Sequence, residues 1–271
     1  IEDGCCSFEQ WQREVFRLHK EHDSKQRQAL IKILGHPRGE ALIRNAETYL
    51  KNHVLSMDWI TSMKHKTPLI TKDEEDGQYY SVSESRNWIR RICRHNGWSV
   101  NQFVNDVKAV MMREHQKKNC LFFKGPSNAG KSTIATSIRD GWLSIGQVTR
   151  SDTFLFMDCV DRQLVFQEEC IVKQETVDDW KRMMEGAVMK VDIKNKEPKN
   201  MRRTPVLVCS NTEPWYWVNN EMRALKNRMF YYTMIEMPEL KNKVKDLNPL
   251  LWLDWMVELA QDCDDDVATP E

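Results

Sequence analysis

The stretch LFFKGPSNAGKST, Leu121–Thr133, joins a short apolar run directly to residues that cannot continue a strand. The run has the length of a buried strand, and strands of parallel sheets are typically continuous apolar segments. Pro126 lacks a backbone donor, and Gly125 and Gly130 permit backbone conformations that other residues avoid. The pattern therefore predicts a strand, a glycine-bounded loop and a helix over about 131–140.

The segment from Gly125 to Ser132 fits the phosphate-binding pattern G-x-x-x-x-G-K-[ST]. Glycines let successive backbone N–H groups point toward phosphate oxygens, and the helix N-terminus adds partial positive charge. Lys131 can reach the β- and γ-phosphates, and the Ser132 hydroxyl can bind Mg²⁺. We therefore predict a site for ATP and Mg²⁺. Its predicted nucleotide-binding residues are Gly125, Pro126, Ser127, Asn128, Ala129, Gly130, Lys131, Ser132 and Thr133.

Two adjacent acids, Glu168 and Glu169, follow a second predicted strand over 164–167. Open α/β sheets bind ligands outside the carboxyl ends of their strands, so both carboxylates should lie near the phosphate loop. Glu168 can hold Mg²⁺ through water, and its neighbour can orient and deprotonate an attacking water. The alternative is an exposed acidic pair at a strand end, which is less favoured once the loop is considered.

Two further candidates lie at the ends of later strands. Asn211 ends the predicted strand 205–211, where an amide can bridge the γ-phosphate and the attacking water; the alternative is an ordinary asparagine turn. Arg228 precedes the predicted strand 229–233, and a guanidinium suits the charge of a transferring phosphoryl group. Spacing alone leaves a surface ion pair equally open for this arginine.

A basic β-hairpin is predicted between the acidic pair and Asn211. Polar and apolar residues alternate from Val188 onward, and Gly186 can mark the entry to the first strand. Lys194, Lys196 and Lys199 fall at or near the tip. Basic groups on a protruding loop suit a nucleic-acid backbone, although an ordinary solvated hairpin has the same pattern.

Composition favours a globular protein without a membrane segment over a disordered one. The chain has 271 residues, of which 41% are hydrophobic and 30% charged, and its formal net charge is zero. No apolar run is long enough to span a membrane. Position 1 is Ile, which favours a segment of a longer protein. The eight cysteines form no C-x-x-C pair, which favours reduced buried thiols in an intracellular protein over zinc or disulfides.

The first 115 or so residues have helical periodicity. Helices are predicted to start at the Ser7–Gln10 capping box, to cover about 25–34 and 40–57, and to start again at Ser83 and Ser99. Their apolar stripes are predicted to be core. The polar segment 67–80 contains Pro68 and Gly77 and is a candidate linker. We predict a helical domain with linker over 1–80, a nucleotide-binding core over 81–240, and a helical segment with an acidic tail over 241–271.

The order and compact spacing of these motifs resemble a superfamily 3 helicase core, most closely the helicase domain of parvovirus non-structural replication initiator proteins. The resemblance covers roughly 100–240. It implies an AAA+-like α/β P-loop NTPase with a mostly parallel central sheet flanked by helices. It also implies that the preceding helices form a small all-helical oligomerisation domain.

The resemblance assigns a role to each motif. Gly125–Ser132 match Walker A, Glu168 and Glu169 match Walker B, and Asn211 matches the sensor 1 residue. Arg228 matches an arginine finger that acts on the ATP of a neighbouring subunit. Within the third motif, Lys181–Lys196, the hairpin lysines would track single-stranded DNA.

The family implied by the resemblance forms hexameric rings that unwind DNA with 3′ to 5′ polarity in the host nucleus. This chain differs in having Phe166-Gln167 where many relatives carry two tryptophans. The family's upstream nicking domain is absent from these residues, so we expect no nicking by this segment. The open alternatives are a superfamily 3 protein of a papillomavirus, a circular single-stranded DNA virus or an RNA virus, and a nucleotide-gated assembly module that does not unwind DNA.

Overall fold

The computed structural model describes residue 32 and residues 36–149 and 153–265. The chain divides into two compact units, Ile1–Met57 and Asp58–Glu271. The second unit contains the sheet and every predicted functional motif. The predictions at Ser7 and over most of 25–34 lie outside the described residues.

In the first unit, the described helix is α3 (Gly39–Ser56), close to the predicted 40–57. Its apolar stripe was predicted to be core, which is wrong for its first turns: the side chains of Leu42 and Ala46 are exposed, with 49% of Leu42 accessible to solvent. Leu50 and Val54 are half-buried. Helical periodicity therefore identified the helix but not what covers its apolar side.

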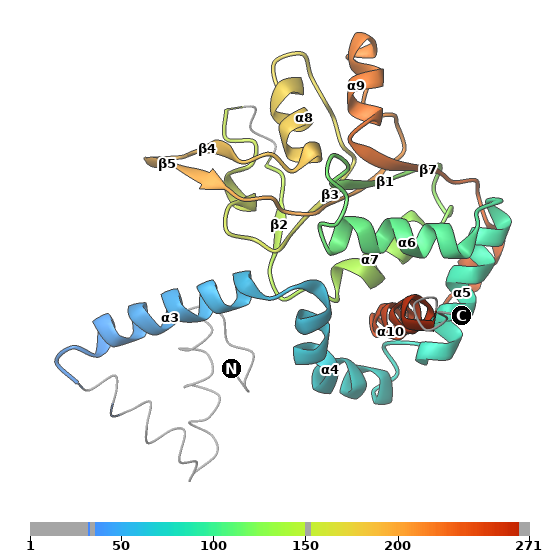
Figure 1. The fold of residues 1–271 in the computed structure, drawn as a ribbon, viewed down its shortest axis with the longest axis horizontal. Helices are drawn as coiled ribbons and strands as arrows, with labels where there is room; N and C mark the ends of the chain where they lie inside the picture. Colours follow the sequence, from blue (N-terminus) through green and yellow to red (C-terminus); the bar gives the residue numbers. More distant parts are fainter. Residues whose placement is uncertain (1–31, 33–35, 150–152, 266–271) are drawn as a thin grey trace, which may run out of the picture. The chain divides into compact units, whose positions relative to one another are not determined.

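The second unit is built on a five-stranded sheet with the order β2-β3-β6-β1-β7, in which every pair is parallel. Figure 1 shows this sheet between helices. The strands are β1 (Cys120–Lys124), β2 (Ile145–Gln147), β3 (Leu164–Glu168), β6 (Val206–Ser210) and β7 (Met229–Thr233). The predicted parallel sheet and four of its strands are confirmed, whereas β2 was not predicted.

Alternate residues of the central strands face opposite sides of the sheet. In β1, Leu121 and Phe123 join one buried cluster, and Cys120 and Phe122 join the other. Because both faces are buried, the strand is apolar throughout, as its sequence indicated.

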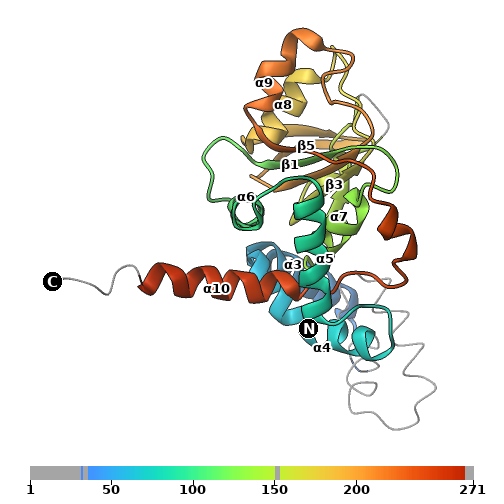
Figure 2. The same ribbon diagram turned by 90° about the vertical axis from the view of Figure 1, so that its right-hand side faces the viewer.

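Figure 2 shows α8 and α9 on one side of the sheet and α6 and α7 on the other. The helices are α4 (Trp59–Glu75), α5 (Val82–His95), α6 (Val100–Met111), α7 (Lys131–Arg139), α8 (Val177–Glu185), α9 (Met222–Lys226) and α10 (Leu251–Asp265), with short 3₁₀ segments η1 (Met157–Cys159), η2 (Asn219–Glu221) and η3 (Pro238–Asn242).

The predicted linker over 67–80 is wrong for most of its length, because α4 continues through Pro68 to Glu75. Proline in a helix interior removes a backbone hydrogen bond. Here Trp59, Met63 and Ile70 on the same helix are buried, and this packing outweighs the lost bond. Pro68 does disfavour a helix locally, but the burial of the helix against the rest of the unit stabilises it more.

The next two helices begin at serine caps. The predicted start of α5 at Ser83 is wrong by one residue, since the helix begins at Val82 after the N-cap Ser81, which forms a capping box with Glu84. The predicted cap of α6 is confirmed: the Ser99 hydroxyl accepts from the backbone N–H of Gln102.

The predicted hairpin forms a separate two-stranded sheet of β4 (Met189–Ile193) and β5 (Lys196–Met201). Lys194 and Asn195 make the turn, and Asn195 adopts a φ of 59°, which asparagine tolerates better than most residues. Gly186 does not enter a strand directly but ends α8 with a φ of 76°.

The cysteines of the described part of the chain are free and buried: Cys93, Cys120, Cys159, Cys170 and Cys209. Among the described residues, no cluster of three or more histidine, cysteine or acidic side chains has the arrangement of a metal site. In the same part of the chain, no helix is both long and apolar enough to cross a membrane.

Candidate functional site

The phosphate loop connects the end of β1 to the start of α7. Gly130 is the N-cap of α7 with a φ of 92°, and because it has no side chain it leaves the first-turn amides uncapped. A Cβ on Gly125 would lie 2.5 Å from the carbonyl oxygen of Met234, so only glycine fits there. The loop thus has the glycine-dependent geometry that brings backbone N–H groups together at a helix N-terminus.

Lys131 is buried at the bottom of this loop and makes three hydrogen bonds. Its ammonium donates to the carbonyl oxygens of Gly125 and Pro126, both at 2.7 Å, and to Oδ1 of Asn211 at 2.8 Å. Burial lowers the pKa of this ammonium, while Cys209 and Glu169 act in the opposite direction. The lysine is therefore fixed in position and directly connected to the end of β6.

The carboxylate of Glu169 is also bonded to the end of β6, the strand end that Lys131 contacts. Its carboxylate accepts a hydrogen bond from the backbone N–H of Asn211 at 3.2 Å and lies 3.4 Å from the hydroxyl of Ser210. Glu169 has a φ of 53°, and its own N–H donates to the carbonyl oxygen of Cys209. A left-handed conformation at a non-glycine residue stores strain, which is frequent at functional sites.

One cavity of about 430 Å³ brings these groups together. Its walls include predicted residues from the phosphate loop, the acidic pair and the end of β6, among them Ser127, Asn128, Gly130, Lys131, Ser132, Glu168, Glu169 and Asn211. Ala129 and Thr133 also line the cavity, whereas Gly125 and Pro126 contribute through their carbonyl contacts to Lys131. The three motifs, spread over eighty-odd residues of sequence, therefore meet in one place.

Sequence reasoning missed Cys209 and Leu240 as cavity-lining residues. Leu240 lies in η3, and Met237, the residue immediately before η3, donates its backbone N–H to the carbonyl oxygen of Asn128 in the loop at 3.0 Å. The segment after β7 is therefore held against the phosphate loop. No local motif marks Leu240, since its position depends entirely on how this segment packs.

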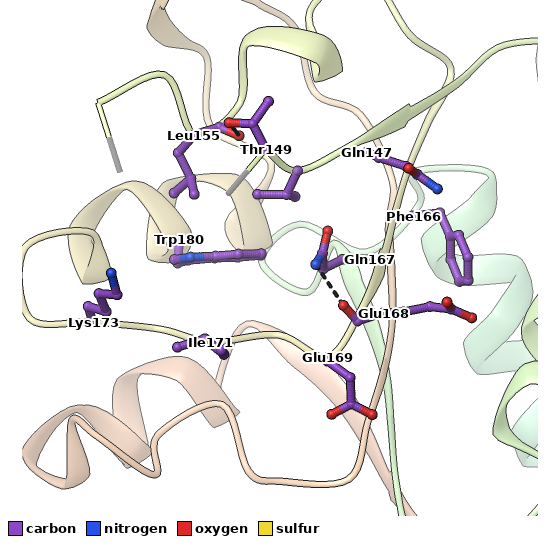
Figure 3. A pocket seen from close by; sticks show the side chains of 11 residues that line it. Gln147, Thr149, Leu155, Phe166, Gln167, Glu168, Glu169, Ile171, Lys173 and Trp180 are labelled. Atoms are coloured by element: carbon purple, nitrogen blue, oxygen red, sulfur yellow. Dashed lines mark hydrogen bonds between the residues drawn. The ribbon is translucent and has the colours of Figure 1, made fainter. Parts of the chain in front are cut away.

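A second cavity of about 570 Å³ adjoins the first, and Glu168 and Glu169 line both. Figure 3 shows that the two carboxylates leave the strand end in different directions, and that the amide of Gln167 bonds to the carbonyl oxygen of Glu168. Trp180 and Ile171 are also on its walls. The divergence of the carboxylates suits two different tasks for two adjacent acids.

Arg228 does not line the phosphate cavity. It precedes β7, whose first residue pairs with Cys120 at the start of β1, whereas the phosphate loop follows the end of β1. The length of a five-residue strand, roughly 16 Å, therefore separates Arg228 from the loop. The guanidinium Nε donates to the carboxylate of Glu185 at 2.8 Å. Within one chain, the arginine is at the wrong end of the sheet to contact a nucleotide bound there.

The three predicted DNA-binding lysines are exposed on the hairpin, away from the cavity. Lys194 is in the turn and Lys196 starts β5. Lys199 lies 3.7 Å from the carboxylate of Asp161, which neutralises part of its charge. Lys194 and Lys196 are therefore the better placed of the three for contact with another molecule.

The comparison with protein families agrees with this arrangement. The family model described as parvovirus non-structural protein NS1 matches residues 17–267, nearly the whole chain. The chain belongs to the parvovirus NS1 family. Curated relatives include the initiator protein NS1 of hamster parvovirus H1 and that of murine minute virus, each 27% identical to this chain over 184 residues. These matches cover 67% of the chain and 26% of either relative, so the chain spans about a quarter of their length.

Solved structures show the same fold. A crystal structure of JCV helicase with a bound small molecule matches this chain with a TM-score of 0.60 and 13% identity, over 89% of this chain and 74% of the other. Another JCV helicase structure matches with a TM-score of 0.51 and 14% identity, over 83% and 66%. The predicted fold class, an AAA+-like α/β core with a mostly parallel central sheet flanked by helices and a helical region before it in the sequence, is confirmed.

Proposed function

We propose that this chain is the ATP-hydrolysing motor of a viral replication initiator, and that it moves single-stranded DNA. The observation that supports it most is the meeting of Lys131 and Glu169 at Asn211: the side-chain oxygen of Asn211 bonds to the lysine and its backbone N–H to the glutamate. A cation for phosphate, an acid for water and a linking amide thus occupy one cavity. A purely structural loop would not require all three.

The residues of the cavity fit a magnesium–nucleotide complex. The phosphate loop offers uncapped amides and a buried ammonium for phosphate oxygens, and the Ser132 hydroxyl and Glu168 carboxylate are the oxygen ligands that Mg²⁺ prefers. When bound, Mg²⁺ would neutralise charge on the β- and γ-phosphates. Lys131 would exchange its carbonyl partners for phosphate oxygens, and Ser132 and Glu168 would hold the metal, the latter through water.

Hydrolysis would then depend on Glu169 and Asn211. Glu169 would accept a proton from the attacking water, and Asn211 would orient that water relative to the γ-phosphate. The hydrogen bond from the Asn211 backbone to Glu169 would keep the base in register with the amide. Since Lys131 also bonds to Asn211, γ-phosphate binding would change the contacts of all three residues together.

The catalytic arginine would come from a second copy of the chain. Arg228 lies at the opposite end of the sheet from its own cavity, so a head-to-tail ring would allow it to reach the ATP of the neighbour. We propose a hexameric ring with the hairpin lysines directed toward DNA. The proposed setting is DNA replication in the host nucleus.

The hairpin lysines provide the experimental test. We expect Lys194→Ala/Lys196→Ala to abolish the increase in ATPase rate caused by single-stranded DNA and to leave the DNA-free rate unchanged, because the hairpin is separate from the cavity. The measurement is steady-state ATPase rate against concentration of single-stranded DNA. The matched control is Lys64→Ala/Lys72→Ala, which removes two exposed lysines from α4.

Several outcomes would contradict the proposal. A chain that turns over no ATP would refute the motor itself. Wild-type stimulation by DNA in the hairpin variant would refute the role of the two lysines and favour a nucleotide-gated assembly module. Equal loss of stimulation in the α4 control would mean that total charge, rather than the hairpin, binds DNA.

A further inference from the structure

The segment after the hairpin and the helix before it are both bonded to one buried residue, Asn119, which immediately precedes β1. Its side-chain amide donates to the carbonyl oxygens of Thr204 at 2.7 Å and Met183 at 3.2 Å, and its side-chain oxygen accepts from Nε of Arg203 at 3.2 Å. Arg203 and Thr204 follow β5, and Met183 is in the last turn of α8, which leads to β4. The segment that follows β5 and the helix that leads to β4 are therefore held by the same side-chain amide.

The connection between α8 and the hairpin has no slack. Gly186 ends the helix, and a Cβ there would lie 2.7 Å from Cγ of Arg203 and 2.9 Å from Cγ of Asn119. The backbone at Gly186 therefore lies close to both side chains, and this contact connects the end of α8 to the segment that follows β5. The last residue of that helix is Glu185.

Arg228 joins this cluster through both its main chain and its side chain. Its carbonyl oxygen accepts from the backbone N–H of Asn119 at 3.2 Å. Its Nε donates to the Glu185 carboxylate at 2.8 Å, and its Nη1 donates to the carbonyl oxygen of Ala224 at 2.7 Å. The Arg228 and Glu185 side chains are 19% and 36% exposed, so another molecule can reach the ion pair.

We propose that Glu185 is a positioning residue that holds Arg228 away from a neighbouring subunit's ATP, and that movement of the hairpin stems releases the arginine. The inference rests on the proposed function of this chain as an ATP-driven motor. The Glu185 carboxylate moves with the end of α8, α8 moves with the hairpin, and the hairpin carries Lys194 and Lys196. A partly exposed ion pair is weak enough to be exchanged for a triphosphate, which carries more charge.

The test is the effect of Glu185→Gln on the dependence of ATPase rate on DNA. We expect the DNA-free rate to rise about two- to fivefold, since that is the population shift that loss of a partly exposed ion pair causes. The rate at saturating single-stranded DNA should stay the same, so that the ratio of stimulated to DNA-free rate falls. A residue with only a structural role would not change this ratio.

Three companion variants sharpen the experiment. Glu185→Ala also removes the acceptor oxygen and should lower the ratio of stimulated to DNA-free rate as well. If the glutamine variant has a lowered melting temperature, the ratio measured for the alanine variant tests the proposal instead. Glu185→Asp keeps the charge and should retain most of the DNA dependence. Asp179→Asn removes an exposed acid from the same helix and should behave as wild type.

The inference and the proposed function fail in different ways. No ATP turnover in the unmodified chain contradicts the motor. If the unmodified chain is stimulated by DNA and the glutamine and alanine variants keep the same ratio, only the role of Glu185 is refuted. Equal loss of the DNA-free and stimulated rates in both variants also refutes it, because Glu185 would then support the arginine rather than withhold it.

Discussion

Replacing Lys131 by methionine is expected to lower ATP turnover by at least about 10²-fold, the usual effect of removing one preorganised charge from a transition state. Methionine keeps the apolar stem of the lysine but none of its donors. The carbonyl oxygens of Gly125 and Pro126 and the amide of Asn211 then lose their common partner. ATP affinity should fall as well, because the ammonium contacts phosphate in the ground state too.

The measurement combines steady-state turnover with titration of a fluorescent ATP analogue. Thermal unfolding must accompany it, since a buried acceptor without a donor costs about 1–3 kcal/mol. Lys72→Met, at an exposed position on α4, is the control for loss of a lysine charge. Wild-type turnover in the Lys131 variant would show that the loop is not the catalytic phosphate site.

Glu169→Gln is expected to separate binding from hydrolysis. The amide oxygen of glutamine can still accept from the backbone N–H of Asn211, so the cavity should keep its shape. Glutamine cannot take up a proton from water, and loss of a general base typically lowers turnover by about 10²–10⁴-fold. ATP affinity should remain close to that of wild type.

The same two assays check this prediction, with Glu175→Gln as the matched control at an exposed acid nearby. Glu168→Gln should differ from the Glu169→Gln and Glu175→Gln variants, because it should raise the Mg²⁺ concentration needed for half-maximal turnover. If instead Glu169→Gln retained turnover and Glu168→Gln lost it, the roles assigned to the two adjacent carboxylates would have to be exchanged.

The sequence was sufficient to predict the parts of the site whose structure depends on residues close together in the chain. Gly125 and Gly130 have to be glycine because of a close carbonyl and a positive φ, and the apolar strand before them is buried on both faces. These requirements act within a few residues, so the strand, loop and helix could be predicted together. The acids after β3 and Asn211 after β6 followed from the rule that parallel strands end at one edge of the sheet.

Other features depended on contacts between distant residues. Gly146 is the middle residue of the three-residue strand β2, where a Cβ would lie 2.7 Å from backbone atoms of Asp158 and Cys159, and no local pattern marks so short a strand. Pro68 indicated a linker, but burial of the same helix outweighed it. The ion-pair partner of Arg228 is Glu185, the last residue of α8 and forty-odd residues earlier in the sequence. The sequence contains no local pattern that predicts this pairing, because it depends on how α8 packs beside the start of β7.

The central claim is that the ATP site is completed by a second subunit, and one mixing experiment tests it directly. Chains with Arg228→Ala and chains with Glu169→Gln should each be inactive alone. In an equimolar mixture, about one interface in four would combine an intact cavity from the first variant with an intact arginine from the second, as expected for a head-to-tail ring. ATPase activity should therefore reappear on mixing, at up to about a quarter of the wild-type rate if interfaces act independently. A mixture as inactive as its components would contradict the claim.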